Sequence, residues 1–410
     1  LPRPSVFGDS RQVATFVLLL LLAAAVVAAG AWWVGRPPQL TADFNVAVAA
    51  VDVSALGDSA NADEVGRMLQ AQVVDIVDRQ LREGAPDTTS VSGTRMPVVG
   101  NTAEAERLAQ QVNAQLVIYG SAQVSGDGVR YAPRFYVDLD AVQADVGEMQ
   151  RDVALDAPLS FTMQQLIEEL PPTGRTAAAA TLLTNFVRAL VKLSAEDIDD
   201  ARRYIDLAVA QTERYVDTYE PFAGREVVYL FASQIARVQA NNSPNRAAHL
   251  AAAQQHAEAA LAINPNYGRG YIALGNLQFD RGDLFGARQT YLTAATLPNQ
   301  PPEALVAIKA AQGLGNVHLR QLIGVHPTAG PCLDEVRRLA DAGLAHYSAV
   351  IAAAGPEPAM PLRALAARAT FYRGEIHQLC AEVEAAALDY AAALEFDTRP
   401  PPVDEIATMQ

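Results

Sequence analysis

The stretch from Tyr267 to Pro298, YGRGYIALGNLQFDRGDLFGARQTYLTAATLP, constrains the fold of this chain more than any other. Small and apolar residues recur at helical spacing on both sides of DRGD, which is a turn sequence. Gly275 and Ala287 allow two helices to approach closely, and Tyr291 fills the groove beside them. The sequence therefore predicts two short helices joined by a tight turn, ending at a proline that cannot continue a helix.

This pattern resembles the tetratricopeptide repeat (TPR), a helical hairpin with a period of about 34 residues. One such hairpin cannot bury its apolar face alone, so neighbouring hairpins must stack on it. The end of the chain keeps the same register, and a Leu–Gly pair at Leu314 and Gly315 keeps part of it. The matching positions are Gly374, Ala386, Tyr390 and Ala393 against Gly275, Ala287, Tyr291 and Ala294.

Helical periodicity continues after Pro171 and Pro172, which mark a domain boundary. We expect five hairpins over residues 174–397, forming a TPR-like α-solenoid, and a flexible tail at 398–410. The predicted fold class is therefore an α+β part followed by an all-α part, with a single transmembrane helix before both.

In TPR proteins the first helix of each repeat lines a concave face on which partners bind. The resemblance implies that this face of the chain binds a partner protein or a membrane complex. A face that is only solvated is the alternative. Matched residue by residue, the expected partner-binding positions in the third and fifth hairpins are Arg269, Ile272, Asn276, Phe279, Asp280, Arg368, Phe371 and Glu375.

The uncharged stretch at 13–34, VATFVLLLLLAAAVVAAGAWWV, is long enough to span a bilayer as one helix. Trp32 and Trp33 lie at its end, and we expect them to anchor it because indole rings favour the headgroup region. The alternative is a cleavable signal peptide, since AAVVAAG offers small residues to a peptidase. The apolar run is longer than the usual signal core, which favours a single-pass membrane helix.

Charges beside this stretch give a weak prediction of orientation. Arg3 and Arg11 precede it, and Arg36 follows it. The positive-inside rule then favours a cytoplasmic tail at 1–12 and a linker at 35–43 that leads outside. The predicted localisation is the cell membrane, with the bulk of the chain extracytoplasmic; the opposite orientation is the alternative.

Residues 44–170 predict a small mixed α/β domain. FNVAVAAVDV reads as a strand, 63–83 as an amphipathic helix, and a weak strand ends in MPVVG. Asn101 and Glu104 predict the start of a helix that runs to Val112. A β-hairpin with its turn in GDG follows, and a last strand is expected around 149–155.

The opening VAV strand, the helix ending in QLRE and the run LAQQVNAQLVIYGSAQ resemble the amino-terminal domain of the periplasmic Tol-system propeller protein. They also resemble domains of the curli-pore lipoprotein type. In those families the domain assembles or docks and is not catalytic, so the resemblance implies a docking role. A spacer domain without such a role is the alternative.

Two cysteines, Cys332 and Cys380, lie near the ends of adjacent predicted helices of similar length. If these helices are antiparallel, a rise of about 1.5 Å per residue brings both cysteines to nearly the same level. A disulfide is then feasible, and it would fit an oxidising compartment. The alternative is two unconnected thiols packed at helix ends.

No pattern in the sequence predicts catalysis, a metal site or a cofactor. His249 and His256 are too widely spaced on one helix for the usual metal pairing, and no Cys, His and Asp have the spacing of a nucleophile and its base. The acidic cluster at 196–200 fits a helix amino terminus, where the dipole favours anions, better than a calcium loop. We therefore predict that the chain is not an enzyme.

The net charge of −15 argues against a nucleic-acid partner, because phosphate contacts need clustered Lys and Arg. The predicted function is a membrane-anchored TPR scaffold for protein partners, held in the lipid bilayer by 13–34. One alternative is a cytoplasmic-facing adaptor or sensor. Another is a structural accessory subunit of a membrane complex, because the small residues at 23–30 favour helix packing in membranes.

Overall fold

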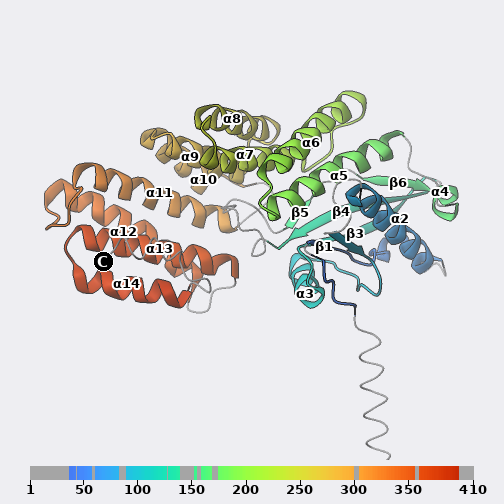
Figure 1. The fold of residues 1–410 in the computed structure, drawn as a ribbon, viewed down its shortest axis with the longest axis horizontal. Coiled ribbons are helices and arrows are strands. Elements are labelled where there is room, and N and C mark those ends of the chain that lie inside the picture. Colours follow the sequence, from blue (N-terminus) through green and yellow to red (C-terminus); the bar gives the residue numbers. More distant parts are fainter. Residues whose placement is uncertain are drawn as a thin grey trace, which may run out of the picture. The chain divides into compact units, whose positions relative to one another are not determined.

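The computed structural model describes residues 37–42, 44–57, 61–82, 89–126, 128–138, 152–154, 158–168, 174–299, 304–355 and 360–396. The chain divides into two compact units (Figure 1). The first, Leu1–Asp138 with Pro158–Thr176, is the sheet domain. The second, Leu139–Ala157 with Ala177–Gln410, holds the helical array and also residues 152–154, which form one strand of the sheet.

The sheet has the strand order β2-β1-β3-β4-β5, and β6 also pairs with β4. β1 runs parallel to β2 and β3, whereas β3 and β4 form the predicted antiparallel hairpin, and β6 is antiparallel to β4. The two parallel pairs require crossovers, which α2 and α3 supply. The bounds are β1 Phe44–Val48, β2 Thr89–Ser92, β3 Leu116–Ser125, β4 Gly128–Val137, β5 Asp152–Ala154 and β6 Leu159–Thr162.

Two helices of the sheet domain, α2 and α3, were predicted, η1 and α4 were not, and one predicted strand lies at another position. The helices of this domain are the 3₁₀ turn η1 (Ser54–Leu56), α2 (Ala62–Arg82), α3 (Thr102–Val112) and α4 (Met163–Ile167). The strand predicted to end in MPVVG lies earlier, at β2, and Val98 forms only an isolated bridge with Ala50. Asn101 caps α3 as predicted, because its side chain accepts a hydrogen bond from the Glu104 amide.

One core cluster of the sheet domain lies where α3 packs on β3 and β4. Ala47, Val117 and Tyr119 share a buried cluster with Leu108 and Val112 of α3. The strand FNVAV includes a polar residue, Asn45, which is fully buried. Its Nδ2 atom donates hydrogen bonds to the carbonyl oxygens of Ala42 and Asn113. The buried amide group therefore keeps its hydrogen-bond partners.

The helical array consists of successive antiparallel hairpins, and the hairpin predicted over Tyr267–Pro298 is confirmed as α9 and α10. Each second helix packs on the first helix of the next hairpin, and first helices also contact one another from α7 to α13 (Figure 1). The bounds are α5 Gly174–Ser194, α6 Ile198–Thr218, α7 Arg225–Asn242, α8 Arg246–Ile263, α9 Gly268–Asp280, α10 Leu284–Thr296, α11 Ala304–Val325, α12 Asp334–Ala354, α13 Met360–Leu379 and α14 Val383–Phe396.

A tyrosine packed against glycine recurs through the array. The Tyr291 ring lies between Gly275 of its own hairpin and Gly313 of α11. A Cβ at Gly275 would come within 2.6 Å of the ring, and one at Gly313 within 2.5 Å. Tyr347 meets Gly315 in the same way, and Tyr390 meets Gly374. These glycines set the distance between neighbouring helices because no side chain fits between backbone and ring.

No helix in the described ranges is long and apolar enough to cross a membrane. α11 is long enough to cross a bilayer. It carries polar and charged side chains, however, as helices with one face toward water do: Lys309, Gln312, His318 and Arg320. The single transmembrane helix in the predicted fold class and the membrane localisation are therefore wrong: the structure is mostly helical with a small sheet domain. The predicted span at 13–34, with its anchors Trp32 and Trp33, lies outside the described residues.

Two alanine substitutions in α11 test the glycine contacts. Gly313→Ala should lower the free energy of unfolding by about 1–3 kcal/mol, because its methyl group meets the Tyr291 ring. Gly324→Ala should raise it by about 0.5–1 kcal/mol, because no heavy atom lies within 4 Å of the added carbon. Urea unfolding followed by circular dichroism measures both, and equal effects at the two positions would contradict this packing.

Candidate functional site

The structure separates the expected partner-binding residues of α9 into interior and surface. Arg269 and Ile272 are 1% and 2% exposed. Ile272 shares a buried cluster with Val306 and Ala310 of α11, which shows that the next hairpin covers this part of α9. Neither side chain can therefore contact a partner directly.

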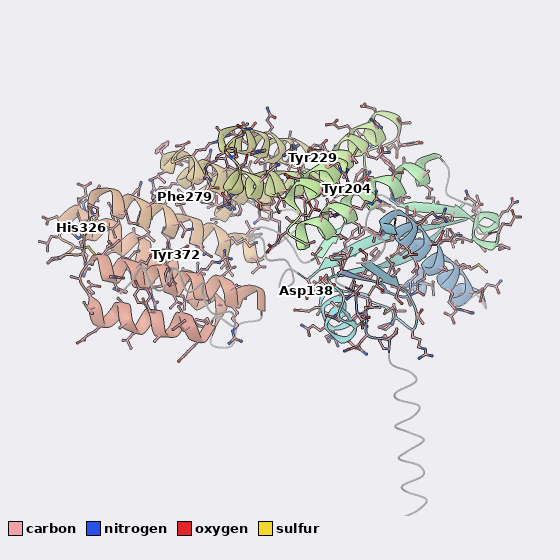
Figure 2. All side chains as sticks on the ribbon, viewed as in Figure 1. Asp138, Tyr204, Tyr229, Phe279, His326 and Tyr372 are labelled. Carbon is pink, nitrogen blue, oxygen red and sulfur yellow. A yellow bond between two sulfur atoms is a disulfide. The ribbon has the colours of Figure 1, made fainter. Side chains whose placement is uncertain are left out.

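The other three α9 residues remain at least partly accessible. Asn276 accepts a hydrogen bond from the Tyr291 hydroxyl, so it helps to hold that ring. Phe279, labelled in Figure 2, and Asp280 are partly exposed, and both lie near the carboxyl end of the helix. Their role as partner-binding residues stays a prediction.

Phe279 and Asp280 are joined to the first helices of both neighbouring hairpins. The Arg237 Nε atom of α7 lies 2.7 Å from the Asp280 Oδ2 atom, and both side chains are 17% exposed. The Arg320 guanidinium of α11 lies over the Phe279 ring, 6.0 Å from its centroid. We call Arg237, Phe279, Asp280 and Arg320 the first-helix cluster.

Sequence reasoning missed the two arginines of this cluster, although one could have been found. Gly315 follows Leu314 as Gly275 follows Leu274, and this register places Arg320 at the position of Asp280. Arg237 gave no such signal, because α7 has no glycine matching Gly275. Only the packing of α7 on α9 brings it to Asp280.

The expected residues of α13 lie at the last described hairpin, separated from α9 in the array by α11 and α12. Arg368 is exposed, while Phe371 and Glu375 are partly exposed. The Phe371 ring contacts that of Tyr390 at 5.5 Å between centroids. Burial, with Glu375 and Asp389 nearby, raises the pKa of Tyr390 to about 12.

Cys332 and Cys380 are joined by a disulfide, one of the two arrangements that the sequence left open. Their Cα atoms are 4.9 Å apart, and the bond ties the segment before α12 to the end of α13. The Gly330 amide donates to the Leu379 carbonyl oxygen beside it, at 2.9 Å. The disulfide therefore fixes the fourth hairpin to the fifth.

Removing this disulfide should destabilise the array. The two cysteines are 48 residues apart, and opening a loop of that length costs about 2–4 kcal/mol. Urea unfolding of the Cys332→Ala/Cys380→Ala variant would measure this loss. Rapid alkylation of two thiols in the native, unreduced chain would show that the bond is absent.

A second group of titratable side chains lies between α11 and α12. The rings of His318 and His346 stack with centroids 5.5 Å apart, and the His318 Nδ1 atom is buried without a hydrogen-bond partner. Burial is the main cause that lowers the pKa of both histidines, and Arg288 of α10 lowers both further. In the described part of the chain, no group of three or more His, Cys, Asp or Glu side chains could hold a metal ion.

These two histidines predict a pH dependence of stability. Their pKa values are lower in the folded chain than the value near 6.5 expected when unfolded. The unfolded state therefore binds more protons below about pH 6.5, and stability is lost as pH falls. The His318→Gln/His346→Gln variant should lose less stability than the parent chain between pH 7 and pH 5, as measured by urea unfolding. If the variant and the parent chain lose the same stability, these histidines do not cause the pH dependence.

In comparisons with known proteins, no family model and no curated protein matches this chain. Among solved structures, the crystal structure of MamA protein matches with 14% sequence identity and a TM-score of 0.32. The match covers 54% of this chain and 98% of that chain. A likeness this low carries no conclusion, so the helical-repeat architecture stands on the packing described above.

Proposed function

We propose that the helical array is a scaffold that binds a segment of another protein along the row of its first helices, and that the chain is not an enzyme. The first-helix cluster carries this proposal. It joins side chains of α7, α9 and α11 at one end of the row and combines an aromatic ring with charged groups.

The chemistry of the cluster favours an acidic partner segment. Asp280 is already paired with Arg237, whereas Arg320 is exposed and, within the described part of the chain, contacts only the Phe279 ring. A guanidinium in this position can bind a carboxylate through two hydrogen bonds. Phe279 beside it supplies apolar contact area, which neutral or aromatic residues of the partner can cover.

The remaining polar groups of the array support a structural rather than a reactive role. The Tyr347 hydroxyl donates to Asn316 at 2.8 Å, and Arg373 pairs with the buried Asp389. Asp197 caps α6 and pairs with Lys192. Such groups fix helices against one another, and their positions give no nucleophile held beside a base.

Quantitative affinity purification from the source cells tests this function. The parent chain is compared with Arg320→Glu and with a matched control, Arg288→Glu, an exposed arginine on the second helix α10. With Arg320→Glu, the amount of each co-purified protein that binds at the cluster should fall by at least about tenfold. Reversing the charge sets like charges against each other. The amounts should be unchanged with Arg288→Glu.

Two results would contradict the proposal. One is a set of co-purifying proteins that does not differ among the three chains. The other is a loss that is equal for Arg320→Glu and Arg288→Glu, which would indicate a general effect of charge.

A further inference from the structure

The last hairpin of the described residues, α13 and α14, leaves exposed a face that is buried at α9 and α10. Arg368, Phe371 and Tyr390 stand in the register of Arg269, Ile272 and Tyr291. The three α9–α10 residues are at most 2% exposed. Their counterparts on α13 and α14 are exposed or partly exposed.

The covered positions show how this face is closed inside the array. Ile272 and Tyr291 lie in one buried cluster with Val306, Ala310 and Leu314 of α11. In the next hairpin Tyr347 is fully buried, and its ring centroid lies 6.0 Å from that of Tyr372 in α13, which is labelled in Figure 2. In these two hairpins, the first helix of the next hairpin contacts the tyrosine of the second helix.

Within the described ranges no hairpin follows α14. This helix also exposes three large apolar side chains, Val383, Leu388 and Leu394, at 72%, 73% and 55%. Repeat arrays need a polar outer face on their last unit to stay apart in solution. The last hairpin therefore has the character of an interface, and we call Arg368, Phe371, Glu375 and Tyr390 its terminal face.

The terminal face is complementary to itself. Arg368, Phe371 and Glu375 are spaced so that they lie along one side of α13, with opposite charges about 10 Å apart at the two ends. A two-fold axis beside Phe371 would set Arg368 of one chain against Glu375 of the other, and the reverse. Both aromatic rings would then lie at the centre, where two-fold interfaces bury their apolar groups.

We propose that the terminal face binds the terminal face of a second copy of this chain, forming a two-fold dimer. Head-to-tail stacking is less suited to the array, because α5 is buried at the consecutive positions Leu182, Leu183 and Thr184 and offers little open surface. The dimer goes beyond the proposed scaffold function, because the first-helix cluster is not part of this face.

Reversing the charges one at a time and together tests the dimer. Arg368→Glu alone and Glu375→Arg alone should each raise the dimer dissociation constant of the full chain by at least about tenfold, because like charges then face each other. The double variant Arg368→Glu/Glu375→Arg should restore the parent value, since a two-fold interface pairs the swapped charges again. Sedimentation equilibrium measures the masses, and circular dichroism checks that each variant is folded.

Several results would overturn the dimer. They are a monomeric parent chain, equal association of all four chains, or a double variant as weak as the single ones. A parent chain that becomes dimeric only after truncation behind Phe396 would likewise overturn it, because the chain's own carboxyl-terminal segment would then cover the face. The Arg320→Glu variant should remain dimeric, because Arg320 is not part of the terminal face. A failure of the dimer proposal is therefore distinguishable from a failure of the scaffold proposal.

Discussion

The close contact between tyrosine rings and helix backbones is the constraint on which the array depends. The Tyr291 ring fits only because Gly275 and Gly313, which both contact it, have no side chain. The first glycine belongs to the same hairpin and the second to the next, so one side chain fixes both the pairing within a hairpin and the stacking between hairpins. Its hydroxyl is held in turn by Asn276. Packing of this kind tolerates almost no added volume.

This stacking decides which side chains remain available for binding. Where a hairpin is followed by another, its register positions are buried, as Ile272 and Tyr291 are beneath α11. Residues nearer the carboxyl ends of the first helices stay accessible, and there Arg237, Asp280, Phe279 and Arg320 meet across three hairpins. The same register at the last hairpin leaves Phe371 and Tyr390 partly open. The two proposed binding surfaces are thus consequences of one packing rule.

Much of the array could be predicted because its signals are local. Gly275, Ala287 and Tyr291 fix one hairpin by spacing alone, and helix rise was enough to bring Cys332 near Cys380. Burial at Arg269 and Ile272 could not be predicted, because it depends on how far α11 reaches over α9. The membrane span was inferred from apolar length at 13–34, and the structure offers no described helix of that kind. The resemblance to a family predicted a face for binding, but it did not predict the contacts that Arg237 and Arg320 make with Asp280 and Phe279.

A double-mutant cycle between Gly313 and Tyr291 tests the central contact most directly. If the ring and the helix backbone are in the contact described, Gly313→Ala should destabilise the parent chain and cost far less when Tyr291 is replaced by alanine. The predicted coupling free energy is about 1–3 kcal/mol. A coupling indistinguishable from zero, with the two single losses simply adding, would contradict the account of how this array is built.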